Sequence, residues 1–159
     1  MGIMNMAEQI HVVPIVLASN KTTSDYVAPH INMKLYEKVE FLVPLTAVGT
    51  AGYTMTVTQS AVTAGSTSTA IAARYRLTAA AGTDTMGDVT ALTTSGKAIA
   101  TADATKTYIV DVDSSDLTTA DKPYAGLTFT HSGSADATIT VIAFCWPKYP
   151  QATNASALT

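Results

Sequence analysis

Hydrophobic and polar residues alternate along most of the chain, and a period of two is typical of β-strands rather than helices. Turn-forming Gly, Pro, Asp and Ser residues separate the alternating runs. The clearest runs share a face made of apolar residues, namely Val39, Phe41, Val43 and Leu45; Tyr53, Met55 and Val57; Ile71, Ala73, Tyr75 and Leu77; and Tyr108, Val110 and Val112. About seven or eight short strands at this spacing predict an all-β fold, either an antiparallel β-sandwich or a jelly-roll-like barrel.

Two of these runs are close neighbours in the sequence. The alternating segments 38–46 and 53–60 are joined by the glycine-containing stretch 49–52. We therefore expect segments 38–46 and 53–60 to pair as an antiparallel hairpin with one apolar face and one hydroxyl-rich face.

Residues 135–149 contain the longest unbroken apolar segment of the chain. A strand here places Ile139, Val141, Ala143 and Cys145 on one face and Thr138, Thr140, Ile142, Phe144 and Trp146 on the other. The second half of this run is apolar on both faces, as in a strand that is covered on both sides. We expect a second layer of the chain, or another subunit, to cover Ile142, Phe144 and Trp146.

The segment His11–Leu17 is also rich in β-branched and apolar residues. Pro14 has no N–H to donate to a neighbouring strand, so this segment is predicted to be an edge strand or an extended strap that lies on a neighbour.

These patterns divide the chain into three parts. Residues 1–18 are interpreted as an extended N-terminal arm, and 19–150 as a single β-sandwich domain. Pro147 and Pro150 stop any sheet, which leaves 151–159 as a C-terminal tail.

The composition argues against several classes of partner. Only 13% of the residues are charged, the formal net charge is −3, and the few Lys and Arg residues are scattered, so nucleic acid is not an expected partner. The start of the sequence has no signal-peptide pattern, and no apolar run approaches the roughly 18 residues of a membrane span. We expect no interaction with a membrane.

The residues that carry chemistry form no recognisable motif, so we expect no catalytic residues, cofactor or small-molecule substrate. Cys145 is the only cysteine, and its mid-strand position predicts a buried structural thiol. Asp111, Asp113 and Asp116 begin like a calcium loop, but Asp116 stands where Gly is required and Lys122 where Glu is required. These acids are either a cation site or a solvated strand end.

Apolar residues at the two ends of the chain are the candidates for contact with a partner. Trp146 and Tyr149 precede the expected tail, and large aromatics are enriched in interface hot spots. They pack either against the end of the chain's own sheet or against another protein. The candidate partner-binding residues are Val12, Val13, Ile15, Leu17, Phe144, Trp146 and Tyr149.

From residue 53 onward, the order of features resembles the head decoration, or capsid cement, proteins of tailed bacteriophages and prophages. The segments that carry the resemblance are Tyr53–Ser60, the loop 61–69, Arg74–Arg76, the excursion 84–97, Tyr108–Asp113 with Leu117, and the ending 148–152.

The resemblance implies a virion protein, made in the host cytoplasm, that binds the outside of an icosahedral capsid. It implies a homotrimer that clamps neighbouring major capsid protein subunits and has no catalytic residues. The alternative is a tail-associated or receptor- or carbohydrate-binding β module. Such a module would cluster exposed aromatics with Asp or Asn in its loops, whereas these loops are rich in Thr, Ala, Gly and Ser.

Overall fold

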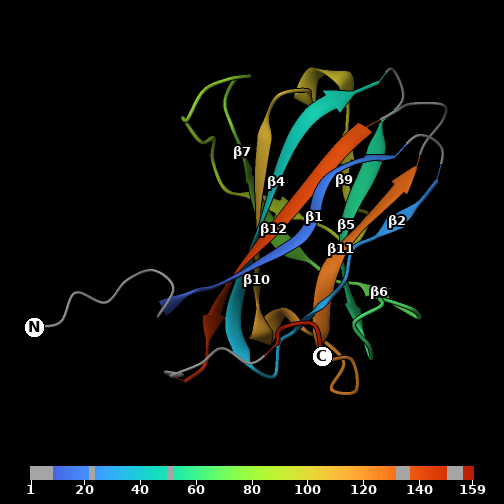
Figure 1. Cartoon of the computed structure of the whole chain (residues 1–159), viewed down its shortest axis with the longest axis vertical. Helices are drawn as coiled ribbons and strands as arrows, with labels where there is room; N and C mark the ends of the chain where they lie inside the picture. The colour runs from blue at the N-terminus through green and yellow to red at the C-terminus, as the bar shows by residue number, and fades with distance from the viewer. Residues whose placement is uncertain (1–8, 22–23, 50–51, 132–136, 150–155) are drawn as a thin grey trace, which may run out of the picture.

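In the computed structural model the chain folds into two antiparallel β-sheets that pack against each other (Figure 1). The structure describes residues 9–21, 24–49, 52–131, 137–149 and 156–159. Short 3₁₀ turns, η1 (Thr101–Asp103) and η2 (Ser114–Asp116), flank β10 (Thr107–Asp113). The predicted all-β sandwich is confirmed.

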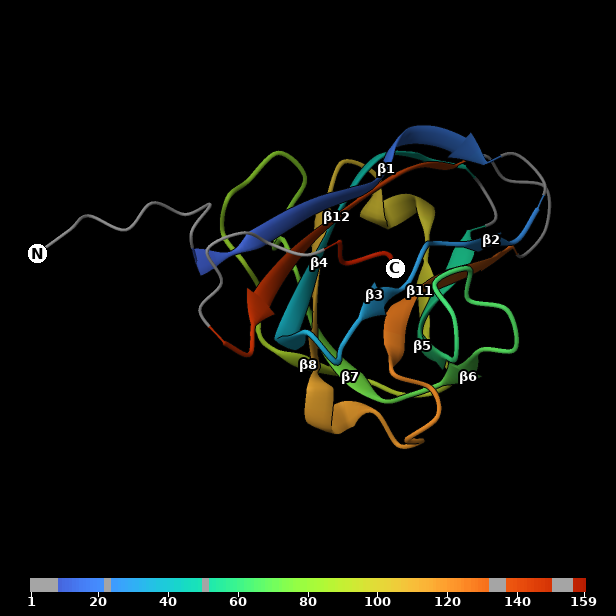
Figure 2. The same cartoon turned by 60° about the horizontal axis from the view of Figure 1, so that its bottom comes forward.

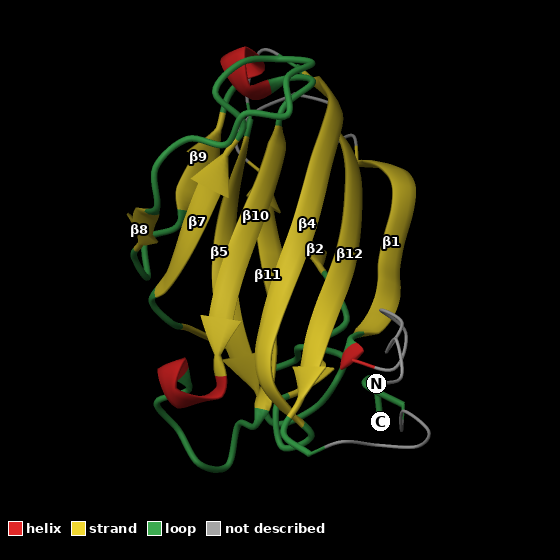
Figure 3. Ribbon diagram, turned by 90° about the vertical axis from the view of Figure 1, so that its left-hand side faces the viewer, coloured by secondary structure: helices red, strands yellow, loops and turns green. Residues whose placement is uncertain are grey.

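The first sheet has six strands and carries the candidate site. Its order is β1 (His11–Lys21), β12 (Ala137–Pro147), β4 (Tyr36–Val48), β10, β7 (Ala73–Leu77) and β8 (Thr90–Leu92). Figure 3 looks onto this sheet, with β1 and β8 at its two edges.

The second sheet also has six strands, and it is built around β11 (Tyr124–His131) and β5 (Tyr53–Ser60). Short strands complete it: β2 (Tyr26–Val27) and β3 (Ile31–Asn32) pair with β11, while β6 (Thr69–Ala70) and β9 (Lys97–Ile99) pair with β5. Figure 2 shows β2, β3 and β6 around β11 and β5, and Figure 1 shows β9 beside β5.

The core lies between the sheets and uses the faces that the alternation predicted. The buried side chains include Val39, Phe41, Val43 and Leu45 of β4, Tyr53, Met55 and Val57 of β5, Tyr108, Val110 and Val112 of β10, and Ile139, Val141, Ala143 and Cys145 of β12. Burying an apolar side chain of this size contributes about 1.5–3 kcal/mol to folding.

The hairpin expected between segments 38–46 and 53–60 is wrong. β4 pairs with β10 and β12 in the first sheet, whereas β5 pairs with β11 in the second. The two strands face each other across the core instead of sharing a ladder. Alternation identifies the buried face of a strand but does not identify its neighbour, because pairing depends on contacts that are distant in sequence.

Of the two alternatives for His11–Leu17, the structure has the edge strand. β1 pairs antiparallel with β12 from His11 opposite Cys145 to Lys21 opposite Ala137. Val13 and Val16 are buried in the core. Residues 11–18 therefore belong to the sheet rather than to a separate arm, and 1–8 lie outside the described residues.

The final four residues of the sequence are likewise part of the folded domain. Ala157 is buried, and its carbonyl accepts a hydrogen bond of 2.9 Å from the backbone N–H of Asn32 in β3 (Figure 2). The carbonyl of Leu158 accepts another, of 3.0 Å, from the Thr63 hydroxyl. The expected tail is therefore docked over residues 156–159, and 151–155 lie outside the described residues.

Candidate protein-interaction surface

Apolar side chains form a row across the outer side of the first sheet. Pro14 of β1 lies opposite Ile142 of β12, Ile142 lies opposite Leu42 of β4, and Leu42 lies opposite Ile109 of β10. Residues that face each other across a ladder point to the same side of the sheet. We call Pro14, Ile142, Leu42 and Ile109 the apolar row.

Three further apolar residues extend the row toward one end of the sheet. Val12 lies opposite Phe144, and Trp146 lies opposite Lys38 of β4. Val12 and Pro14 are exposed, while Phe144 and Trp146 are half-buried by their neighbours. The apolar row together with Val12, Phe144 and Trp146 is called the apolar surface; it lies on the side of the sheet turned toward the viewer in Figure 3.

A cluster of charges borders the apolar surface on β4 and β10. The Lys38 ammonium lies 2.6 Å from a Glu40 carboxylate oxygen and 3.1 Å from one of Asp111. Partial burial opposes the charge on Lys38, but hydrogen bonds with Glu40 and Asp111 outweigh it and raise the pKa of Lys38. Lys38 therefore remains a cation at neutral pH beside the apolar residues.

Trp146 is held against this cluster. The Lys38 ammonium lies 5.5 Å from the centroid of the Trp146 ring, which is within the range of a cation–π contact. The indole is thus partly fixed before any partner arrives.

Some of the predicted partner-binding residues lie close together or are exposed in the structure, and others are not part of the apolar surface. Val12 and Phe144 are cross-strand neighbours, although they come from opposite ends of the sequence. Leu17 is 67% exposed and Tyr149 is 75% exposed, so both remain available for contact.

Val13 and Ile15 do not belong to a contact surface. Val13 is only 7% exposed and Ile15 packs against the core. The contact prediction for both residues rests on 1–18 being an arm outside the sandwich, whereas β1 pairs with β12 as a strand of the first sheet.

Leu42 and Ile109 belong to the surface but were not among the predicted contact residues. Both occupy the strand face opposite the core, where polar residues are usual in an exposed sheet. In the sequence, the only sign that these two residues belong to a contact surface is that each is apolar on the outward face of its strand. It became informative only when the ladders placed Leu42 and Ile109 next to Ile142.

The acidic residues at the end of β10 are engaged within the chain. Asp111 pairs with Lys38, Asp113 pairs with Arg74, and a carboxylate oxygen of Asp116 accepts a hydrogen bond of 2.9 Å from the Asp113 backbone N–H. Within the described ranges, no group of three or more His, Cys, Asp or Glu residues is arranged to hold a metal ion.

The buried nucleophile and the buried histidine lie away from this surface. Burial raises the pKa of the Cys145 thiol to about 12. His30 is fully buried, with Nδ1 2.8 Å from the Ala28 carbonyl and Nε2 2.9 Å from the Thr58 hydroxyl. The Ala28 carbonyl can only accept, so Nδ1 carries the proton and neutral His30 accepts from Thr58 through Nε2.

Two hollows elsewhere on the molecule are small. One of about 220 Å³ is lined in part by Met33, Leu117 and Pro123, and one of about 260 Å³ lies beside Tyr75 and Lys106. Sites for small ligands usually occupy about 300–1,000 Å³. The apolar surface is therefore the stronger candidate site.

Comparisons of the chain with protein-family models, with curated proteins and with solved structures find no match. Among the helices in the described part of the chain, none combines the length and the apolar character needed to span a bilayer.

Proposed function

We propose that this protein is a structural virion protein that binds the outer surface of an icosahedral phage capsid and stabilises neighbouring major capsid protein subunits. The observation that carries the proposal is the apolar surface, which runs across β1, β12, β4 and β10 on the side of the sheet away from the core. Contiguous apolar patches on soluble domains usually mark contact sites.

The resemblance to phage head decoration proteins supports the choice of partner. It covers segments of both sheets, including β5, β7 and β10. The low proportion of charged residues, 13%, also suits a protein that works by close contact.

The size of the surface favours several simultaneous contacts. With strands about 4.8 Å apart and about 3.4 Å per residue, four strands of about seven residues cover roughly 460 Å². Both partners together would bury about 900 Å², which is less than the roughly 1,000 Å² of a specific interface, so one such contact alone would be weak. A homotrimer would present three such surfaces to the shell and raise the affinity through avidity.

Binding of this kind stabilises the shell by mass action. A protein that bridges subunits and prefers the assembled lattice shifts the equilibrium away from disassembly, by about 2.7 kcal/mol per site at a hundredfold excess over its Kd. Neither a catalyst nor a cofactor is required.

Co-sedimentation tests the proposal. Purified protein is mixed with decoration-free heads of the phage that encodes it, the heads are pelleted, and their melting temperature is measured. The wild-type chain should pellet with heads and raise their melting temperature. Ile142→Asp should abolish both effects, whereas Val62→Asp, which changes an exposed valine in a loop of the other layer, should not.

Failure of the wild-type protein to pellet with heads would contradict the proposal. Binding to purified tails, or to host-surface carbohydrate, in place of heads would favour the receptor-binding or tail-associated alternative.

A further inference from the structure

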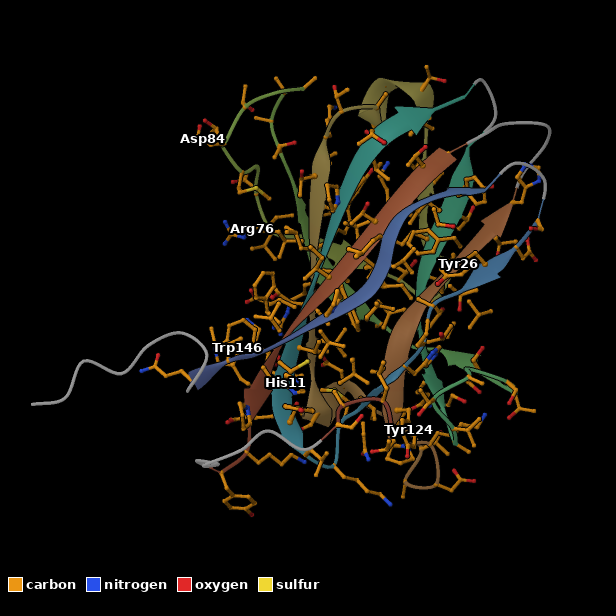
Figure 4. The ribbon with its side chains drawn as sticks, viewed as in Figure 1. His11, Tyr26, Arg76, Asp84, Tyr124 and Trp146 are labelled. Atoms are coloured by element: carbon orange, nitrogen blue, oxygen red, sulfur yellow. The ribbon has the colours of Figure 1, made fainter. Side chains whose placement is uncertain are left out.

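The apolar row ends at an arginine. Arg76 of β7 lies opposite Ile109 of β10, so its side chain continues the row from Pro14, Ile142 and Leu42 to the next strand. Figure 4 shows Arg76 pointing away from the sandwich, on the same side of the molecule as Trp146. From Pro14 to Arg76, four steps between strands of about 4.8 Å span about 19 Å.

Arg76 differs from the other cations on this side of the sheet. Lys38 pairs with Glu40 and Asp111, and Arg74 pairs with Asp113. Within the described part of the chain, Arg76 forms no ion pair and no side-chain hydrogen bond, and it is exposed. Its guanidinium is therefore free to take a new acceptor.

The position of Arg76 determines which partner chemistry fits. A surface that covers Ile109 would also remove water from part of the Arg76 guanidinium, and an unpaired cation is costly to desolvate. A carboxylate offers the planar, two-point acceptor that a guanidinium matches best. Arginine beside apolar anchors is also a common composition of binding hot spots.

We propose that the apolar row and Arg76 form one docking surface for an acidic segment of the shell protein. This segment places apolar side chains against Ile142, Leu42 and Ile109 and a carboxylate against Arg76. The inference rests on the proposed function, because that function supplies the shell as the partner.

A second copy of the chain fits this surface less well. The carboxylates on the same side of the sheet, Glu40, Asp111 and Asp113, are already paired with Lys38 or Arg74. In a face-to-face pair of copies, Arg76 would meet only carboxylates that already have a cationic partner, whereas an acidic segment of the shell protein brings a carboxylate of its own.

The test measures binding of four full-length variants to decoration-free heads by quantitative co-sedimentation at low and high salt. Arg76→Glu should weaken binding at least tenfold, and Arg76→Gln should weaken it by a smaller factor. Arg76→Lys should bind heads more tightly than Arg76→Gln but less tightly than wild type. Lys34→Glu, which makes the same charge change at an exposed site in the turn before β4, should bind like wild type.

Each departure from this pattern has a defined meaning. If wild type binds heads and Arg76→Glu binds equally well, the docking inference is wrong while the proposed function stands. Equal losses in Arg76→Glu and Lys34→Glu would indicate non-specific attraction and would overturn the inference. If wild type does not bind, the proposed function fails first.

Two further measurements complete the test. Melting of each variant in the absence of heads should match wild type, because Arg76 is exposed and makes no contact that folding requires. Sedimentation of the free protein should give the same mass for wild type and Arg76→Glu. A mass that falls with Arg76→Glu would assign the surface to a second copy and contradict the shell protein as its occupant.

Discussion

The ammonium of Lys38 lies 5.5 Å from the centroid of the Trp146 ring while it also contacts the carboxylates of Glu40 and Asp111. This arrangement fixes the largest aromatic side chain of the apolar surface at the boundary with a charged cluster. A side chain that is already ordered loses less conformational entropy when a partner covers it.

Trp146→Ala should therefore weaken binding to heads strongly and change stability little. Hot-spot residues of this type contribute about 2 kcal/mol or more, which is roughly a thirtyfold change in Kd. The fold should lose less than about 1 kcal/mol, because Trp146 lies on the outer side of the sheet and not in the core. Titration of heads and urea unfolding measure the two effects. An unchanged Kd would remove Trp146 from the site.

Val13→Ala should mainly reduce the stability of the fold, whereas Leu17→Ala should mainly weaken contact with a partner. Val13 is buried, so its truncation should reduce the free energy of unfolding by about 2 kcal/mol. Leu17 is mostly exposed, and its truncation should cost less than about 0.5 kcal/mol while weakening any partner contact near β1. Urea unfolding of both variants decides this. Equal stabilities would mean that β1 is not anchored in the core.

The stability of the fold should fall as the pH drops below about 6.5. Burial lowers the pKa of His30 in the folded state, with only partial compensation from the bond to the Ala28 carbonyl, whereas the unfolded residue keeps its ordinary value of 6.5. The unfolded chain thus binds more protons in this window, so unfolding becomes easier on acidification. Above pH 6.5 both states are neutral at His30 and this contribution is constant.

Urea unfolding between pH 5 and 8 tests the role of His30. His30→Gln should be less stable than wild type at neutral pH but should lose stability less steeply between pH 6.5 and 5. The burial of His11 also lowers its pKa, so some slope should remain in this variant. An identical slope in both proteins would mean that His30 does not carry the effect.

Cys145→Ser should destabilise the protein without abolishing binding. Cys145 is fully buried on the inner face of β12, and a serine hydroxyl without a partner there would cost about 1–3 kcal/mol. The native thiol should also react slowly with thiol reagents, because burial raises its pKa to about 12. A variant that folds as stably as wild type but no longer binds heads would contradict the structural role.

The buried faces of the long strands could be predicted from the sequence because burial of alternate residues is a local property. Val39, Phe41 and Tyr108 follow it without exception. Strand neighbours could not be predicted: β4 and β5 are close in sequence but lie in different sheets.

The candidate site could be predicted only in part for the same reason. Phe144 and Trp146 stood out as apolar residues on the second face of an apolar strand. Leu42, Ile109 and Arg76 joined them only through ladders between strands that are distant in sequence. Val13 is buried because residues 11–18 form a strand of the first sheet and not an arm outside the sandwich, and apolar composition alone does not distinguish these two cases.

The most direct test of the central claim is an electron cryomicroscopy reconstruction of phage heads decorated with the wild-type protein. We predict density on the outer surface of the heads in which the side of the first sheet that carries Leu42, Ile142 and Trp146 faces the shell. A reconstruction in which that side points to solvent, or in which saturating protein adds no density to the heads, would contradict the account.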